Sequence, residues 1–286
     1  MTAATTSTAT PAAGWGPAAC RGAFSLTFDN LGEAAALERG LPVSEDVRGR
    51  HPSAAYLPRL IDLLDGLPCT YFVEACNTGM YPDAIRGWAD AGQEIGIHAW
   101  RHEHWAAVET PRRKELLQRS MDAFAAMGLR PRGFRPPGGE MPEGALQEFL
   151  DAGLDYCSPL GGLGDTTVEA GVAVMPFAWR HVDAFMLSPD LGWMREQYGF
   201  PGKASTLDEW EQELRAGVDF ALAHGRHVTV VLHPGQLVDP GKHEVLRRHV
   251  ALLKSTPGLW VASCSQVADW LGTSSASLSA SPSATH

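Results

Sequence analysis

Short apolar runs alternate with amphipathic segments along most of the chain. The first apolar run covers residues 23–28, and residues 54–64 behind it carry apolar side chains at helical spacing. Such runs predict buried strands, and apolar residues that recur every three or four positions predict helices. We therefore expect strands at residues 23–28, 70–73, 94–97, 133–135, 155–157, 172–175, 227–232 and 260–262, and helices at 54–64, 82–91, 111–127, 143–152, 207–223 and 244–253.

The alternation of strands and helices predicts an α/β protein with a mostly parallel sheet. With seven or eight strands, the pattern favours a closed or nearly closed β/α barrel over an open doubly wound sheet, although periodicity alone does not decide between them. No Gly-x-Gly-x-x-Gly sequence follows the first expected strand. In both architectures the functional groups are expected beyond the C-terminal ends of the strands.

The sequence predicts one folded unit at residues 21–272. The 286-residue chain contains no repeat, and its 44% hydrophobic content is enough for one large core. Residues 1–20 are rich in Ala, Thr and Pro, and residues 273–286 are rich in Ser and Ala. Neither segment has the apolar content that offsets the entropy lost on folding, so we expect both to be disordered tails.

Composition argues against some classes of partner. The formal net charge is −10 and no block is rich in Lys or Arg, which disfavours nucleic acid because its binding depends on neutralising phosphates. The first 17 residues have neither a basic start nor a continuous apolar run, so we expect no secretory signal, no membrane span and a cytoplasmic location. Five scattered cysteines without a Cys-x-x-Cys pair indicate reduced thiols.

Three histidines follow the strand expected at residues 94–97. His98 and His102 are four residues apart, which predicts that they lie on one side of a helical turn, where two imidazoles can bind one metal ion. The alternative interpretation is a solvated histidine cluster at the start of a helix. His104 adds a third imidazole, for which we favour a surface position over a role as ligand.

Polar residues also follow the other expected strands. Because the ends of parallel strands meet at one rim of a sheet, residues remote in sequence should gather there. These residues are Asp29 and Asn30 after the first strand, Glu74 and Asn77 after the second, His98 and His102 after the third, Arg135 after the fourth, and His233 after residues 227–232.

Five short motifs are spaced along residues 23–270: TFDN at 27–30, HAWRH at 98–102, FRPPGG at 134–139, DYCS at 155–158 and VLH at 231–233. With them the chain resembles the polysaccharide deacetylases with a NodB-homology domain, or carbohydrate esterase family 4. The resemblance implies a distorted (β/α)7–8 barrel and a metal-dependent N-deacetylase. The stretches TYFVEACN and LHPG also resemble branches that act on smaller amides, ureides or cyclic imides.

The resemblance implies a metal site at His98, His102 and Asn30. Zinc is the expected metal, with cobalt or nickel as alternatives. Asn30 stands where the family commonly has a second Asp, and its amide oxygen can bind a metal but carries no charge, so we expect weaker affinity. Glu33 and Glu74 are candidates for a compensating carboxylate.

The resemblance also implies three catalytic residues. Asp29 would take a proton from water, and Arg135 would pair with Asp29 to keep it ionised. His233 would donate a proton to the departing amine, which is needed because an amide anion leaves poorly. The alternative interpretations are a helix cap for Asp29 and a buried histidine bonded to a backbone group for His233.

The remaining candidates concern the substrate. We expect contacts with a small-molecule or saccharide N-acyl substrate at Glu74, Asn77, Pro137, Gly138 and Trp100. An aromatic platform is a further expectation, although core packing is expected for at least half of the candidates Trp100, Trp105, Trp179 and Trp193.

The leading prediction is a hydrolase of non-peptide amide bonds that removes an N-acetyl or N-formyl group from an amino sugar or small natural product. One alternative is a hydrolase that opens cyclic imides or ureides at the same site. A second alternative is a non-catalytic member that binds a saccharide or metabolite, in which Asn30 marks a decayed metal site. The sequence leaves the substrate and the oligomeric state open.

Overall fold

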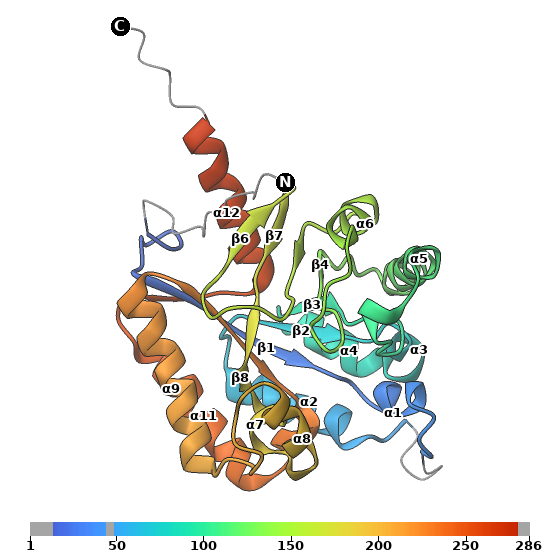
Figure 1. The fold of residues 1–286 in the computed structure, drawn as a ribbon, viewed down its shortest axis with the longest axis horizontal. Helices are drawn as coiled ribbons and strands as arrows, with labels where there is room; N and C mark the ends of the chain where they lie inside the picture. The colour runs from blue at the N-terminus through green and yellow to red at the C-terminus, as the bar shows by residue number, and fades with distance from the viewer. Residues whose placement is uncertain (1–13, 44–48, 280–286) are drawn as a thin grey trace, which may run out of the picture.

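The computed structural model describes residues 14–43 and 49–279 of the chain (Figure 1). The strands are β1 (Gly22–Asp29), β2 (Cys69–Val73), β3 (Glu94–Ile97), β4 (Gly133–Phe134), β5 (Tyr156–Cys157), β6 (Thr167–Glu169), β7 (Val172–Val174), β8 (Phe177–Val182), β9 (His227–Leu232) and β10 (Leu259–Val261). The helices are α1 (Ala34–Glu38), α2 (Pro52–Leu64), α3 (Asn77–Met80), α4 (Pro82–Asp90), α5 (Thr110–Ala126), α6 (Ala145–Asp151), α7 (Asp183–Leu187), α8 (Gly192–Gln197), α9 (Leu207–His224), α10 (Pro234–Leu237), α11 (Pro240–Ser255) and α12 (Cys264–Ser279).

The strands form a strongly curled, mostly parallel sheet in the order β6-β7-β5-β4-β3-β2-β1-β9-β8, with β10 beside the start of β1. The chain beyond β5 reaches β8 through a parallel bridge between Leu160 and Phe177. There the Phe177 N–H donates to the Pro159 carbonyl at 2.9 Å and the Gly161 N–H donates to the Phe177 carbonyl at 3.0 Å. These contacts join the two sides of the curled sheet, so the predicted distorted barrel is confirmed.

Side chains of β1 alternate between a polar and an apolar face. Phe24 packs beside His249 of α11, and Phe28 packs edge-on against Trp88 of α4, so the apolar face lies under the helices. On the other face, Ser25 Oγ bonds to His227 of β9 at 2.8 Å. All eight residues of the strand are buried, as expected where helices cover a sheet that curls on itself.

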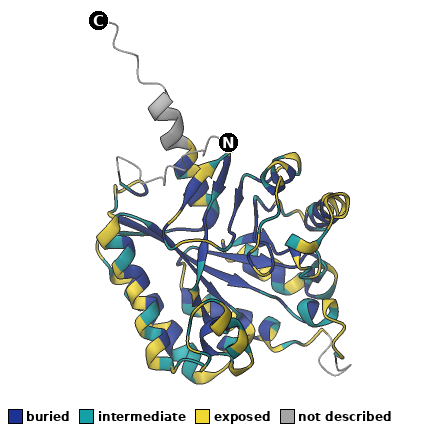
Figure 2. Cartoon of the chain, in the orientation of Figure 1, coloured by how far each residue is buried: buried dark blue, intermediate teal, exposed yellow. Residues whose placement is uncertain are grey.

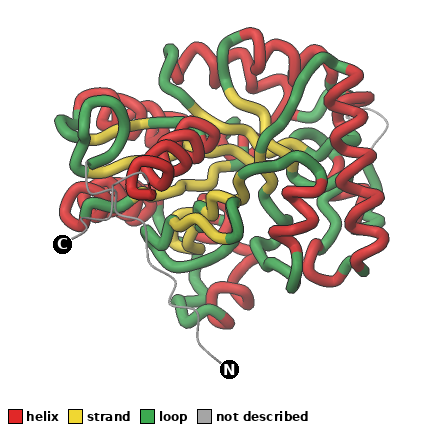
Figure 3. Tube along the Cα trace, turned by 90° about the horizontal axis from the view of Figure 1, so that it is seen from above, coloured by secondary structure: helices red, strands yellow, loops and turns green. Residues whose placement is uncertain are grey.

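The helices lie around the strands, as the view in Figure 3 shows. Their exposed sides face outward while their buried sides face the sheet (Figure 2). Local sequence fixes the ends of α9, which packs on β1 and β9. Thr206 Oγ1 accepts from the Glu209 N–H, the Glu209 side chain accepts from the Thr206 N–H, and Gly225 ends the helix with a φ of 62°.

The ordered unit extends beyond the predicted limits of 21 and 272. Residues 1–13 and 280–286 lie outside the described residues, but Trp15 is only 1% exposed and its Nε1 donates to the Gly225 carbonyl at 2.9 Å. The prediction for residues 14–20 was therefore wrong, because one aromatic residue anchors a segment of otherwise small and polar composition. Helix α12 likewise continues to Ser279. Among the described helices, none combines the length and apolar content that a membrane span requires.

Candidate active site

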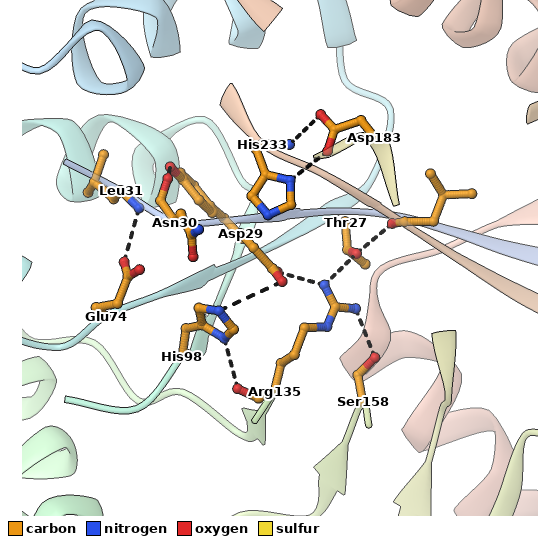
Figure 4. A network of polar contacts seen from close by, with 12 residues as sticks. Thr27, Asp29, Asn30, Leu31, Glu74, His98, Arg135, Ser158, Asp183 and His233 are labelled. Atoms are coloured by element: carbon orange, nitrogen blue, oxygen red, sulfur yellow. Dashed lines mark hydrogen bonds and ion pairs between the residues drawn. The ribbon is translucent and has the colours of Figure 1, made fainter. Parts of the chain in front are cut away.

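Arg135 joins two strand ends at the rim of the barrel (Figure 4). It follows β4 and is completely buried, and its Nη1 donates to Asp29 Oδ1 at 2.7 Å and to Thr27 Oγ1 at 2.8 Å. Its Nη2 donates to Ser158 Oγ at 2.8 Å, which gives the DYCS motif a role in holding the guanidinium. The expected Arg135–Asp29 pair is present, so Asp29 has a fixed positive partner in a buried position.

Aromatic rings hold the Arg135 guanidinium in place. Its central carbon lies 4.1 Å from the ring centroid of Phe72 in β2 and 5.4 Å from that of Phe177 in β8. Cation–π contacts of this kind stabilise a buried guanidinium and limit its rotation. Arg135 therefore presents a stable charge to Asp29 from a rigid setting.

His98 is oriented by the backbone of the same arginine. Its Nδ1 lies 2.8 Å from the Arg135 carbonyl oxygen, which can only accept, so Nδ1 carries the proton and Nε2 is left as a lone-pair donor. Nε2 lies 3.9 Å from Asp29 Oδ2. Burial lowers the pKa of His98 to about 3, which favours the neutral imidazole that binds metals.

His98 and His102 lie together, but not on the predicted helical turn. Residues 98–104 form a loop after β3, in which Ala99 and His102 have φ values of 61° and 77°. The two rings are nevertheless 4.9 Å apart between centroids. Burial, with the nearby His98 as a second cause, lowers the pKa of His102 to about 3. The predicted closeness of the two imidazoles is therefore present, the predicted helical turn was wrong, and metal binding by the pair stays a prediction.

Glu74 lies with the two histidines in a group of side chains that could hold a metal ion. One carboxylate oxygen of Glu74 and one ring nitrogen from each of His98 and His102 lie within 4.8 Å of one another. Glu74 is completely buried, and burial raises its pKa to about 8. Its Oε1 and the Oδ1 of Asn30 are buried and have no hydrogen-bond partner among the described residues. Two imidazoles beside oxygen atoms without partners fit a divalent cation.

His233 is held by an aspartate that the sequence analysis missed. Asp183 Oδ1 lies 2.5 Å from His233 Nδ1, and Asp183 Oδ2 accepts from the His233 N–H at 2.8 Å. Although burial by itself lowers the pKa of His233, the charge and hydrogen bond of Asp183 outweigh burial and raise it. Asp183 follows β8, which was not predicted because Trp179, Arg180 and His181 interrupt its apolar pattern. Because the strand itself was not recognised, the acidic residue after it gave no usable signal.

The other carboxylate and imidazole candidates have different partners. Glu33 accepts from the Tyr81 hydroxyl at 2.5 Å and from the Gly49 N–H at 3.1 Å, so both of its oxygens are engaged. The His104 side chain is 65% exposed and lies 3.5 Å from Glu140 Oε2, in the surface position favoured for it. Of the two candidate carboxylates, Glu33 and Glu74, it is Glu74 that lies beside the histidines.

The expected substrate contacts lie in several environments. Asn77 is completely buried, and its Nδ2 donates to Glu74 Oε2 at 3.1 Å and to the Leu31 carbonyl at 2.7 Å, so its amide supports Glu74. Pro137 is buried and Gly138 is exposed with a φ of 78°. The ring of Trp100 lies under the Arg119 guanidinium at 3.8 Å. Direct contact of these residues with substrate stays a prediction.

The tryptophans behave largely as core residues. Trp105 is completely buried against Phe134, and Trp179 stacks on Phe185 with ring centroids 5.2 Å apart. Trp100 is partly buried, whereas Trp193 on α8 is 64% exposed. The expectation that at least half would pack in the core is confirmed for Trp105 and Trp179.

The geometry can be compared with known proteins. The family model "Polysaccharide deacetylase" matches residues 19–157. Residues 19–157 are thus similar to the polysaccharide deacetylase family. The family match covers Asp29, His98, His102 and Arg135, while His233 and its aspartate partner lie beyond it.

Individual proteins support this assignment. A peptidoglycan deacetylase from Helicobacter pylori is 26% identical over 112 residues, which are 38% of this chain and 38% of that protein, so the match spans well under half of the relative. A solved structure from Mycobacterium smegmatis, named as a polysaccharide deacetylase, has a TM-score of 0.76 and 24% identity and covers 96% of this chain and 98% of its own. An allantoinase structure has a TM-score of 0.69 and 18% identity, covering 90% and 92% of the two chains. At these identities the structural likenesses show a shared fold.

Proposed function

We propose that the chain is a metal-dependent hydrolase that removes an N-acyl group, acetyl or formyl, from an amino sugar or a small natural product. The observation that carries the proposal is the position of Asp29. Its Oδ1 is held by Arg135 at 2.7 Å, and its Oδ2 lies 3.9 Å from the metal-binding nitrogen of His98. A carboxylate fixed by one oxygen, with the other beside a metal-binding nitrogen, is placed to accept a proton from an attacking water.

His98, His102 and a neighbouring oxygen ligand would hold the metal in this mechanism. A divalent ion there supplies positive charge that polarises the amide carbonyl. Zinc is our first proposal, and cobalt or nickel also suit imidazole ligands. Arg135 holds Asp29 in position through their ion pair, and the His98 Nδ1–H bond to the Arg135 carbonyl keeps Nε2 free for the ion.

His233 would act as the general acid. Asp183 binds its Nδ1, so Nε2 is the nitrogen left to deliver a proton to the departing amine. The raised pKa of His233, which results from Asp183 despite the opposing effect of burial, favours the protonated form that this role requires. The retention of both proton-transfer residues in bonded positions argues against the non-catalytic alternative.

A second candidate is the opening of a cyclic imide or ureide. The same base, acid and metal would serve this reaction, and the chain shares its fold with an allantoinase. The test is a hydrolysis screen with product mass detection, in which the protein is loaded with zinc, cobalt or nickel. N-acetyl and N-formyl amino sugars and small amides form one panel, and hydantoins, succinimide and allantoin form the other.

Amine release with acetate or formate supports the first candidate, and ring-opened products without amine release support the second. Asp29→Asn serves as the inactive control, and Glu115→Gln, in an exposed ion pair with Arg112, serves as a surface control. Equal turnover by wild type and Asp29→Asn contradicts the mechanism in either case. Tight ligand binding without turnover at any metal favours the non-catalytic alternative.

A further inference from the structure

We infer that Glu74, at the end of β2, supplies the carboxylate ligand of the metal site, so that the negative charge expected at position 30 has moved to the neighbouring strand end. The inference rests on the metal-dependent function proposed above and specifies its ligand set. Asn30, directly after β1, is a neutral residue, and Glu74 lies within 4.8 Å of His98 and His102, measured between possible ligand atoms. Figure 4 shows Asp29, Asn30, Glu74 and His98 in the same part of the rim.

The Glu74 carboxylate is fixed through one oxygen only. Its Oε2 accepts from the Leu31 N–H at 3.0 Å and from Asn77 Nδ2 at 3.1 Å. Its Oε1 is buried and has no hydrogen-bond partner among the described residues. A buried polar atom without a partner is costly, whereas a bound cation would satisfy it. Two donors on one oxygen therefore present the other to the histidines.

Asn77 ties this carboxylate to the loop after β1. Its Nδ2 also donates to the Leu31 carbonyl at 2.7 Å, so both backbone groups of Leu31 are involved in positioning Glu74. Outer partners of this kind orient metal-binding side chains and limit their rotation. The arrangement is that of a ligand with its supporting groups, which a substrate-contacting glutamate would not need.

The negative charges already present in the site explain why position 30 is neutral. Asp29 is already a buried carboxylate and is paired with the buried Arg135. An aspartate at position 30 would add a third carboxylate to a site that has Asp29 and Glu74, and like charges in a buried site oppose each other. Asparagine avoids this repulsion, and it tolerates the left-handed conformation at this position, where φ is 62°. Asn30 and Glu74 therefore form a compensating pair.

The test measures metal binding without turnover. Metal-free protein is titrated with zinc in competition with a coloured chelator, and the cobalt-loaded protein is recorded by visible absorption. Glu74→Gln should weaken zinc binding by about 100-fold or more, because loss of even an outer partner of a ligand costs about 10–100-fold. Its cobalt spectrum should also change. Asn30→Ala should change the zinc affinity and the cobalt spectrum less than Glu74→Gln does.

The double variant Glu74→Gln with Asn30→Asp gives the decisive comparison. It returns the charge to position 30 and should recover much of the lost zinc affinity, whereas Asn30→Asp alone should not tighten binding. Glu33→Gln is the matched control, because Glu33 is also buried but both its oxygens bond to other groups. Thermal unfolding of metal-free protein checks that each variant folds.

The inference is overturned if Glu74→Gln binds zinc as wild type does, or if Asn30→Ala loses more affinity than Glu74→Gln. It is also overturned if the double variant is no better than Glu74→Gln in a folded protein. These outcomes leave the proposed hydrolase intact when the wild type still binds zinc and turns over. A wild type that binds no zinc, cobalt or nickel contradicts the proposed function itself and removes the basis of the inference.

Discussion

The main-chain carbonyl of Arg135 accepts the Nδ1–H of His98 at 2.8 Å, while the guanidinium of the same residue binds Asp29 at 2.7 Å. One buried residue thus sets the tautomer of a candidate metal ligand and the orientation of the candidate base. A change at Arg135 should therefore affect folding and chemistry together.

Arg135→Gln should destabilise the fold and abolish activity. Removing one partner of a buried ion pair costs about 3–5 kcal/mol, because the remaining charge is left buried. Urea denaturation measures the change. Arg132→Gln is the control, since its ion pairs with Asp155 and Asp269 are at the surface and should be worth about 1 kcal/mol or less. Similar losses of unfolding free energy in Arg135→Gln and Arg132→Gln would contradict the claim that burial makes the Arg135 ion pair the more important one for stability.

Asp29→Asn should lose turnover under conditions in which it remains folded, and it should also lower stability because it removes one partner of the same buried ion pair. The amide cannot accept a proton from water at neutral pH, and general acid–base groups contribute about 10²–10⁴-fold in rate. The comparison is kcat of wild type and variant on the substrate found by the hydrolysis screen, with circular dichroism to check folding. A variant that retains the wild-type kcat would show that another group acts as base.

Strand ends could be read from the sequence because each candidate follows a clear apolar run. Asp29 and His233 each stand just after an expected strand and Arg135 is the last residue of one, and a parallel sheet brings such ends together. His98 and His102 were predicted to be close because they were expected on one helical turn. They lie instead on a loop that depends on a positive φ at Ala99. Such conformations are uncommon outside glycine and have no strong sequence signal.

The partner of His233 could not be read in the same way. Asp183 lies fifty positions from His233 and follows β8, whose central residues Trp179 and Arg180 obscure the strand pattern. Only the pairing of β8 with β9 brings the two side chains together. The orientation of the Glu74 carboxylate likewise depends on a hydrogen bond from the Leu31 N–H. A sequence motif does not show which main-chain N–H groups a side chain will bind. Both contacts depend on how distant parts of the chain pack together, which local sequence patterns do not reveal.

His98→Ala and His102→Ala should each lower the metal content of the purified protein. Each substitution removes one imidazole from a small ligand set, so the loss should be severe in both. His104→Ala is the matched control, because that histidine lies at the surface beside Glu140 and should leave the metal content unchanged. Elemental analysis after dialysis against a fixed zinc concentration gives the comparison. Equal metal in His98→Ala and His104→Ala would remove His98 from the site.

Asp183→Asn should shift the pH dependence of the reaction to lower pH on its alkaline side. His233 must be protonated to donate to the leaving amine, and Asp183 raises its pKa in spite of burial. Without that negative charge, burial dominates and the pKa of His233 falls, so the acid form is lost at a lower pH. An amide has only one acceptor oxygen, so the variant keeps at most one of the two hydrogen bonds from His233, and the position of the alkaline limb, not the rate at one pH, reports the lost charge. The measurement is kcat/KM against pH for wild type, Asp183→Asn and the exposed control Asp190→Asn. An alkaline limb that stays in place in Asp183→Asn would mean that His233 is not the group whose protonation limits the rate.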